Sequence, residues 1–403
     1  MKILIINQPV ANRGDESAHK ALVRSLSKKY PDSSIDVVYF GEIYENAKPM
    51  EANCPNLHYE YVDFQKGLIS IAYHSIKYNL GGLITSLIPA YRKLDQKIKS
   101  SDYVICAPGG ICLGGFMDWN HLFWLMRAKQ HKKKLAYYSR SFGPFDTSTP
   151  RKALFKKKSI EILNYFDFLS IRDGKTMELA RQLNLNYVPS IDTAFLERVD
   201  CKSEIDQLSL SSEYIIFVPN SLTWHPAYKN VSSQRIASFY EDLINALMEK
   251  NPNNQIVMLP QLFGKIYNRD YDFFNVIKEK SRFKEQILVL NDNLSSDIQQ
   301  TIIKHSRLVV GARYHSIVFA INNEIPFVSL SYEHKMFGLL EILSLENRQI
   351  DITQIGTKSF DEDKAIQEFR TILNEQISVA QESKIAKSIA QKCFDQLTSS
   401  FLK

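Results

Sequence analysis

The chain has 403 residues, of which 44% are hydrophobic and 23% are charged. This composition is ordinary for a globular protein, and the length exceeds what one hydrophobic core usually serves, so two domains are expected. The formal net charge of +6 favours anionic ligands or a phospholipid surface, but it is too small to indicate a nucleic-acid-binding protein.

Strand-like apolar runs alternate with helix-like segments through the first half of the chain. The run KILIIN is too short and too soon polar for a signal peptide, and it predicts a first strand. Helical spacing of apolar residues follows in SAHKALVRSLSKKY. The next predicted strands are IDVVYF, DYVICAPGG, KLAYYS, FLSIRD and NYVPSID, and helices are predicted around HLFWLMRAKQHKK, residues 150–165 and KTMELARQL. This alternation is typical of a parallel sheet with helices on both faces.

Residues 67–94 form the most membrane-like segment, GLISIAYHSIKYNLGGLITSLIPAYRKL. His74, Lys77, Asn79 and a Gly-Gly pair interrupt it, so a membrane-spanning helix is not expected. Two interpretations remain open. The segment is either a pair of apolar helices packed on its domain, or a surface that partly touches a bilayer with Tyr and Lys or Arg at its margins.

The second half of the chain begins after a polar stretch at residues 198–212, which is predicted to link domains at 1–197 and 211–403. Strands are predicted there at EYIIFVPNS, QIVMLPQ, QILVLND, RLVVGAR and PFVSLSY, with helices at 233–250, near 268–280, from Ser296, and at 316–322. Residues 361–401 predict one or two terminal helices that pack back on the first domain. We therefore expect an α/β fold with two Rossmann-like αβα domains in tandem and a cleft between them.

The cysteines favour reduced thiols in a cytoplasmic protein. Cys54, Cys106, Cys112, Cys201 and Cys393 are scattered without a C-x-x-C pair, and their odd number argues against a disulfide framework. No zinc site can be assembled from this spacing, so no metal is expected.

Glycine and polar residues gather where the predicted strands end. Ligands of open parallel sheets bind beyond the carboxyl ends of the strands, so these ends locate a site. They read NQPVANRGDESA, APGGICLGG, SRSFGPF, SIRDGK and SIDTAF in the first half, and VPNSLTWHP, LPQLFG, GARYHS and SYEHK in the second. A coordinated set of such endings predicts a functional cleft.

The loop from Asn12 to Glu16 has two interpretations. Asp15 or Ser17 caps the helix that follows, or Arg13 and Asp15 face the cleft with Asp15 or Glu16 free for proton transfer. Gly14 would then lie against the substrate.

The Gly109-Gly110 turn does not have the G-x-G-x-x-G spacing of a dinucleotide site. It still allows the backbone to approach a ligand closely. In the next turn, Asp173 is predicted to cap a helix, and Arg172 points either to Asp173 or into the cleft.

In the loop PNSLTWH, Ser221 and His225 are candidate substrate contacts, as is Gln261 in LPQLFG. Trp224 either stacks on a sugar face or anchors the loop as a buried side chain.

The hexapeptide GARYHS, residues 311–316, joins a strand to an apolar helix. An isolated R-x-H is usually an ordinary turn. If the helix begins near Arg313, its positive N-terminal end adds to a guanidinium fork that suits a phosphate or carboxylate. His315 can donate to the same anion or transfer a proton. Lys335 adds a further positive charge, so an anion pocket is predicted.

These motifs, taken in order, resemble the polysaccharide pyruvyl transferase family. The most specific part is the C-terminal block, which consists of G-x-R-x-H-S, the spacing from Ala320 to Pro326, and S-Y-x-x-K ending at Lys335. The N-terminal matches are N-x-G-D at Asn12–Asp15, the Gly-Gly turn, S-x-G-P from Ser141, R-D at Arg172 and D-x-A-F from Asp192. The resemblance therefore spans nearly the whole chain.

The resemblance implies transfer of the pyruvyl group of phosphoenolpyruvate to two hydroxyls of a sugar, giving a cyclic ketal, on a two-domain fold like that of the GT-B glycosyltransferases. The acceptor would belong to a cell-surface polysaccharide, such as an exopolysaccharide or capsule of the bacterial envelope, or to its lipid-linked precursor. Phosphoenolpyruvate is a co-substrate, and no other cofactor is expected. A peripheral position at the inner face of the membrane, through residues 67–94, would suit a lipid-linked acceptor.

By the same resemblance, the first domain binds the acceptor and the second binds the donor. Arg313 and His315 bind the donor anions, with Lys335 and Arg172 assisting. Tyr314 stands where relatives often have leucine, so a backbone contact is expected to survive there.

The reaction also needs an acid and a base. We expect His315 to protonate the methylene carbon of the donor, and Asp15 or Asp192 to accept the proton of the acceptor hydroxyl. Two other classes of function remain open, a GT-B-like glycosyltransferase that uses a nucleotide sugar and a non-enzymatic protein that binds saccharides or anions. The first would need a carboxylate pair for ribose, for which the sequence gives no clear candidate.

Overall fold

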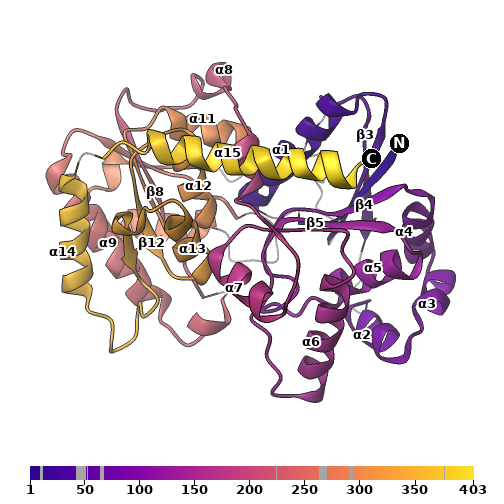
Figure 1. Cartoon of the computed structure of the whole chain (residues 1–403). Coiled ribbons are helices and arrows are strands. Elements are labelled where there is room, and N and C mark those ends of the chain that lie inside the picture. The colour runs from indigo at the N-terminus through magenta and orange to yellow at the C-terminus, as the bar shows by residue number, and fades with distance from the viewer. Residues whose placement is uncertain are drawn as a thin grey trace. The chain divides into compact units, whose positions relative to one another are not determined.

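The computed structural model describes residues 1–9, 12–41, 51, 53–63, 68–223, 225–262, 270–290, 294–375 and 377–403. The chain divides into two compact units (Figure 1). The N-terminal unit comprises Met1–Val10, Ala18–Leu196 and Ser388–Lys403, and the C-terminal unit comprises Ala11–Ser17 and Glu197–Lys387. The N-x-G-D loop therefore belongs to the C-terminal unit, although it lies near the start of the sequence.

The sheet of the N-terminal unit is parallel, with seven strands among the described residues in the order β3-β2-β1-β4-β5-β6-β7. The strands are β1 (Lys2–Gln8), β2 (Ser34–Gly41), β3 (Leu57–Asp63), β4 (Tyr103–Cys106), β5 (Lys134–Arg140), β6 (Phe168–Ile171) and β7 (Val188–Pro189). The predicted strands are confirmed, but β3 was missed. It lies at an edge of the sheet, where polar and apolar residues alternate instead of forming a continuous apolar run.

The helices of this unit are α1 (Arg13–Lys29) from Ala18 onwards, α2 (Leu68–Tyr78), α3 (Gly81–Leu87), α4 (Pro89–Ser100), α5 (Trp119–Gln130), α6 (Pro150–Leu163) and α7 (Gly174–Gln182), with the end of α15 (Ala380–Gln396). The apolar segment at 67–94 thus folds as α2, α3 and the start of α4. Within the described residues, none of the helices is long and apolar enough to cross a membrane.

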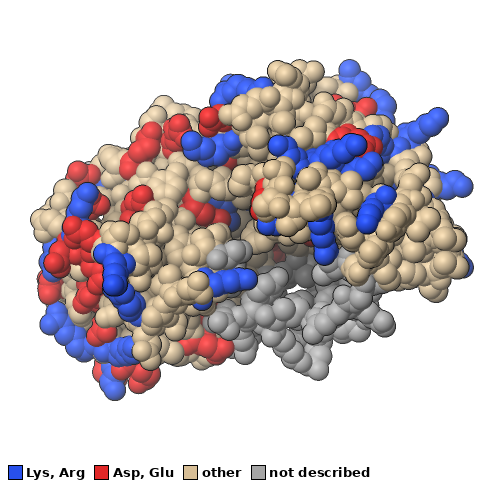
Figure 2. All heavy atoms as spheres, turned by 90° about the horizontal axis from the view of Figure 1, so that it is seen from below, with Lys and Arg blue, Asp and Glu red and all other residues tan. Residues whose placement is uncertain are grey.

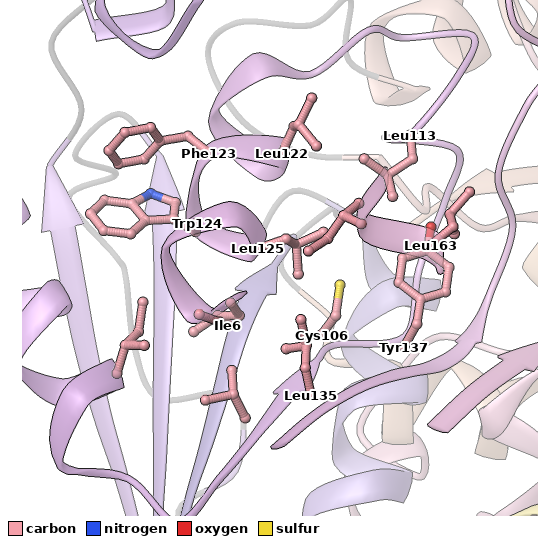
Figure 3. Close-up of a cluster of buried hydrophobic side chains, with 14 of the residues drawn as sticks. Ile6, Cys106, Leu113, Leu122, Phe123, Trp124, Leu125, Leu135, Tyr137 and Leu163 are labelled. Carbon is pink, nitrogen blue, oxygen red and sulfur yellow. The ribbon is translucent and has the colours of Figure 1, made fainter. Parts of the chain in front are cut away.

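Alternate residues of β1 build two separate cores. Leu4 and Ile6 pack with α5 and neighbouring strands on one face, where Figure 3 shows Ile6 and Cys106 in the same cluster as Trp124. Ile3 and Ile5 pack on the other face with residues of α1 and with a C-terminal set, Cys393, Phe394, Leu397, Phe401 and Leu402. Because successive strand residues point to opposite faces, both sides of the sheet are covered.

The C-terminal unit has a parallel sheet of six strands among the described residues, ordered β10-β9-β8-β11-β12-β13. They are β8 (Tyr214–Val218), β9 (Gln255–Met258), β10 (Ile287–Val289), β11 (Leu308–Gly311), β12 (Phe327–Ser331) and β13 (Gln349–Asp351). The helices are α8 (Lys202–Ile205), α9 (Ser233–Lys250), α10 (Asp270–Lys280), α11 (Ser296–Lys304), α12 (Tyr314–Asn322), α13 (His334–Ile342), α14 (Glu362–Asn374) and the start of α15. The sequence missed β13, a three-residue edge strand.

The predicted fold class is confirmed, since each unit is a parallel sheet with helices. On the face shown in Figure 2, basic and acidic side chains of the described residues are interspersed with large uncharged areas. This distribution fits the modest net charge and the absence of a nucleic-acid signature in the sequence.

Candidate functional site

Three neighbouring strands of the C-terminal unit end together. Gly311 of β11 pairs with Val218 of β8 on one side and with Ser329 of β12 on the other. The loops after these strands contain PNSLTWH, GARYHS and SYEHK, so the sheet brings three of the predicted motifs to one edge.

Arg313 is the N-cap of α12, which begins at Tyr314, two residues before the helix predicted at 316–322. A Cβ on Gly311 would lie 2.1 Å from Ser316 Oγ, so the strand can turn this tightly into the helix only with glycine there. Ser316 Oγ donates to the carbonyl oxygen of Arg313 at 2.6 Å, which closes the turn. Arg313 therefore lies at the positive N-terminal end of α12, where the helix dipole stabilises an anion.

The Arg313 side chain is buried and forms an ion pair with Asp270 at the start of α10. Asp270 Oδ2 accepts hydrogen bonds from the backbone N–H groups of Gln261 at 3.0 Å and Leu262 at 2.9 Å. Burial opposes the charged form of Arg313, but the Asp270 carboxylate, together with Tyr332 and Tyr240, raises the pKa of Arg313 overall. A permanently charged guanidinium is therefore held in a fixed position. The Gln261 backbone helps to hold Asp270, and a contact of the Gln261 side chain with substrate stays a prediction.

His315 packs directly on Gly14. A Cβ on Gly14 would lie 1.8 Å from His315 Nδ1, so no other residue fits in this arrangement. The Gly14 loop is fixed to the same sheet edge, because Arg13 N–H donates to the Gln261 carbonyl oxygen at 2.9 Å and Asn12 forms an isolated bridge with Leu262. The structure thus brings together two motifs that are about three hundred residues apart, both within the C-terminal unit.

The first turn of α1 corrects part of the prediction for this loop. Helix α1 begins at Arg13, and the side chain of Asn12 accepts the Gly14 N–H at 2.7 Å, so neither Asp15 nor Ser17 is the cap. Glu16 is buried, pairs with Arg13 at 2.6 Å and accepts from Ser296 N–H and Oγ at 3.2 Å. Glu16 is therefore committed to structure, whereas Asp15 is only half-buried.

Lys335 lies beside Tyr314 and Glu333. Its Nζ is 2.8 Å from a Glu333 carboxylate oxygen and 5.6 Å from the centre of the Tyr314 ring. Burial would raise the pKa of Glu333, but the Lys335 ammonium, together with Tyr332 and His225, lowers it overall. Tyr314 is buried, so its ring supports the Lys335 charge through a cation–π contact.

His225 belongs to an aromatic group in the loop after β8. Its Nδ1 accepts the Ala227 N–H at 3.2 Å, and its ring lies 5.4 Å from Tyr228 and 6.1 Å from Tyr332, between ring centres. Burial lowers the pKa of His225. Ser221 is buried in the same loop, and Trp224 lies outside the described residues.

In the N-terminal unit, Arg172 and Asp192 form a buried ion pair. Asp192 also accepts the Ala194 N–H at 3.0 Å. Arg172 is thus paired with Asp192, a partner that the sequence did not suggest, and its contact with a ligand stays a prediction. The prediction for Asp173 is confirmed, since it caps α7 by accepting the Thr176 N–H at 2.9 Å.

The Gly109-Gly110 turn surrounds the buried guanidinium of Arg140. Arg140 donates to the carbonyl oxygens of Ala107 at 2.5 Å and Gly110 at 3.1 Å, and to Cys112 Sγ at 3.0 Å. A Cβ on Gly109, whose φ is +156°, would lie 3.2 Å from Arg140 Nη1. The turn therefore needs glycine to admit Arg140.

Cys112, Asp118 and His121 lie close to this arginine. Their ligand atoms are all within 4.8 Å of one another, and among the described residues they form the group that could hold a metal ion. Sulfur, oxygen and nitrogen donors suit zinc. The spacing of the cysteines in the sequence did not reveal this combination. Burial raises the pKa of Asp118 and lowers that of His121. The sequence missed Arg140, Asp118, His121 and Asp270, although S-x-G-P directly follows Arg140 and could have drawn attention to it.

Two surface hollows lie away from all these residues. One of about 540 Å³ is lined by Lys132–Lys134 and both chain ends, and one of about 500 Å³ includes Lys250 and Arg348. Both adjoin the amino ends of strands, whereas ligands of parallel sheets bind at the carboxyl ends. We therefore place the candidate site with the motifs.

Two αβα units with chemistry-bearing residues at the carboxyl ends of their strands define a GT-B-like protein. Solved structures of that class share the fold. A UDP-GlcNAc 2-epimerase from Methanocaldococcus jannaschii is 11% identical, with a TM-score of 0.58 and 99% of each chain covered. A UDP-glucose:anthocyanidin 3-O-glucosyltransferase is 12% identical, with a TM-score of 0.53 and coverage of 98% of this chain and 94% of that chain.

The chain belongs to the polysaccharide pyruvyl transferase family, whose model matches residues 12–334. The match begins at the Asn12 loop and ends at the SYEHK segment, so it includes both motifs that meet at Gly14 and His315. The amylovoran biosynthesis protein AmsJ of Erwinia amylovora is 23% identical over 380 residues, which cover 88% of this chain and 89% of that protein. The resemblance predicted from the sequence is thereby confirmed.

Proposed function

We propose that the protein transfers the pyruvyl group of phosphoenolpyruvate to two hydroxyls of a sugar in a cell-surface polysaccharide, or in its lipid-linked precursor, and forms a pyruvate ketal. The observation that supports this most is the contact of His315 with Gly14 beside the Arg313–Asp270 pair, in a chain of this family. We place the reaction in the cytoplasm, where phosphoenolpyruvate is available.

The donor carries a carboxylate and a phosphate, so it requires several cationic groups. Arg313 supplies a guanidinium with five N–H donors, and Asp270 orients this guanidinium through their ion pair. The positive end of α12 adds to this field, and Lys335 adds a second cation. We assign the binding of the donor anions to these groups.

The chemistry needs one proton delivered and others removed. Protonation of the donor methylene carbon makes C2 electrophilic, and we assign that proton to His315. A sugar hydroxyl then attacks C2, and the second hydroxyl displaces phosphate, which leaves with the C–O bond electrons and takes up the proton of that second hydroxyl. We assign the first hydroxyl proton to Asp15, which follows Gly14 in the first turn of α1. Asp192 is the weaker choice, because it is fully buried against Arg172.

We assign acceptor recognition to the N-terminal unit. Its glycine-rich turn, Arg140 and Asp118 lie at the carboxyl ends of β4 and β5, where a sugar would meet both an N–H donor and a carboxylate. Neutral sugars are bound through such paired donors and acceptors. The contacts of Gly109 and Gly110 with Arg140 make these glycines supports for that arginine.

The test is release of phosphate from phosphoenolpyruvate in the presence of candidate oligosaccharide acceptors. We expect release to depend on the acceptor and to be lost in His315→Ala, while His305→Ala, an exposed histidine of the same unit, remains active. Nucleotide release from a UDP-sugar, with no reaction of phosphoenolpyruvate, would show a glycosyltransferase instead. Saccharide binding without turnover of either donor would show a binding protein.

A further inference from the structure

Helix α3 presents an apolar face that its unit does not bury. Leu80, Leu83 and Leu87 are 40%, 53% and 65% exposed, and Tyr78 just before the helix is 56% exposed. Of the nine large hydrophobic side chains that are exposed among the described residues, these four fall within ten consecutive positions. Such a concentration marks an interaction surface, unlike single exposed leucines.

The three leucines share one face of the helix because they are spaced i, i+3 and i+7. The opposite face carries the buried residues Gly81 and Thr85. A Cβ on Gly81 would lie 3.2 Å from Arg127 Cδ of α5, so this side of α3 is packed tightly against its unit. Figure 1 shows α3 outside α5, at the margin of the N-terminal unit. Because the opposite face of α3 is packed against its unit, the leucines remain exposed.

Basic side chains bracket this face. Lys77 precedes it, with Nζ 4.9 Å from the centre of the Tyr78 ring, and Arg92 follows it and donates to the Ser86 carbonyl oxygen. Both are exposed. Residues 68–100 contain five basic residues, Lys77, Arg92, Lys93, Lys97 and Lys99, against one acidic residue, Asp95.

The acidic residue does not reach this face. Asp95 is paired with Arg127 at 2.7 Å and with His131 at 3.0 Å, both on the side of α5. Lys93 and Lys97 are partly neutralised by Glu60, at 2.5 Å and 3.2 Å. The cations next to the leucines are thus Lys77 and Arg92, and the local charge there is positive.

We propose that the face formed by Tyr78, Leu80, Leu83 and Leu87, with Lys77 and Arg92, docks the protein on a bilayer surface that contains anionic phospholipids. The leucines enter the boundary between headgroups and acyl chains, Tyr78 lies at the interface, and the two cations meet lipid phosphates. A basic rim around an apolar centre complements an anionic membrane, whereas a second copy of this chain would bring like charges together. This inference goes beyond the proposed function and holds for any reaction the protein catalyses.

The test is flotation of the full chain with vesicles of phosphatidylcholine alone, and with vesicles that also contain phosphatidylglycerol. We expect binding to the anionic vesicles, weakened by salt. Leu83→Ser combined with Leu87→Ser should reduce partitioning roughly tenfold or more, since two half-exposed leucines lose their transfer to lipid. Lys77→Glu combined with Arg92→Glu should reduce binding to anionic vesicles most.

The matched control is Val276→Ser combined with Ile385→Ser, two exposed hydrophobic residues of the C-terminal unit. It should partition like the wild type, and thermal melting should show that every variant is folded. Equal loss in the control, unchanged flotation of the leucine variant, or absence of wild-type binding to anionic vesicles would each overturn the proposal. So would a wild-type dimer in solution that the leucine substitutions dissociate. Since no donor or acceptor is present, the result is independent of the proposed reaction.

Discussion

Gly14→Ala should remove most of the activity and leave the protein folded. The added Cβ would lie 1.8 Å from His315 Nδ1, 1.9 Å from Cγ and 2.5 Å from Cβ. Cβ atoms essentially never approach within 3.0 Å, so the ring must retreat by about 1.2 Å, the difference between these distances. His315 is buried and bounded by the rings of Tyr314 and Phe319, at 5.0 Å and 6.1 Å between centres, so it cannot move without disturbing them.

The magnitude follows from two costs. A misplacement of about 1 Å at a reacting group lowers the rate by about 100-fold. Overpacking of a core costs about 1–3 kcal/mol, less than the 5–15 kcal/mol that ordinarily separates folded from unfolded protein. We therefore expect kcat/KM for phosphate release to fall by about two orders of magnitude, while the melting temperature drops by only a few degrees.

The assay compares Gly14→Ala with Gly82→Ala by steady-state kinetics and thermal melting. Gly82 lies in α3, and a Cβ there would meet only the end of the flexible Arg127 side chain, at 4.0 Å. Gly82→Ala should be fully active and slightly more stable, since alanine favours a helix. A folded Gly14→Ala protein that keeps at least half of the wild-type kcat/KM would refute the reasoning that the position of His315 depends on this glycine.

Three further predictions concern buried groups. Asp270→Asn should raise the KM for phosphoenolpyruvate more than it lowers kcat, because Arg313 loses the carboxylate that orients it. The control Asp272→Asn, on the exposed side of α10, should change neither KM nor kcat. Asp192→Ala should lower the free energy of unfolding in urea by about 3–5 kcal/mol, because it leaves the Arg172 charge buried without its partner, and a loss below 1 kcal/mol would contradict the ion pair. Burial, with Lys20 and Arg24 nearby, lowers the pKa of His19 to about 3, so the unfolded chain binds a proton there that the folded chain does not. The free energy of unfolding should thus fall as the pH drops from about 6.5 towards 3, by at most about 1.4 kcal/mol per pH unit. In urea titrations at a series of pH values, His19→Gln should lose less stability per pH unit than the wild type. Equal pH slopes for the two proteins would exclude this contribution.

The sequence was sufficient for the fold class because the central strands are continuous apolar runs. Strands such as β4 and β8 are buried on both faces, so their residues carry an unmistakable pattern. The edge strands β3 and β13 carry a weaker pattern, the first because its residues alternate and the second because it has three residues. Local sequence also predicted the cap at Asp173, and it predicted α12 with a start two residues too late.

The partners of the site residues depended on tertiary contacts that no local pattern contains. Asp270 is paired with Arg313 across 43 positions, and Arg172 with Asp192 across 20. The contact between Gly14 and His315 requires the Asn12 loop to join the C-terminal unit. A membrane role of residues 67–94 cannot be tested by deleting the segment, because the deletion would remove core residues such as Ala72, Ile76 and Tyr91. Substitutions on the exposed face of α3 test it without that damage.

The most direct test of the central claim follows carbon from the donor into the product. The protein is incubated with phosphoenolpyruvate labelled with carbon-13 at C2 and with an acceptor that supports phosphate release, and the saccharide is examined by NMR. We expect the label to appear as a ketal carbon bonded to two sugar oxygens, in equal amount to the phosphate released. His315→Ala should give no labelled ketal, whereas His305→Ala should give it. Label that remains in free pyruvate, or a ketal formed equally well by His315→Ala, would contradict the central claim.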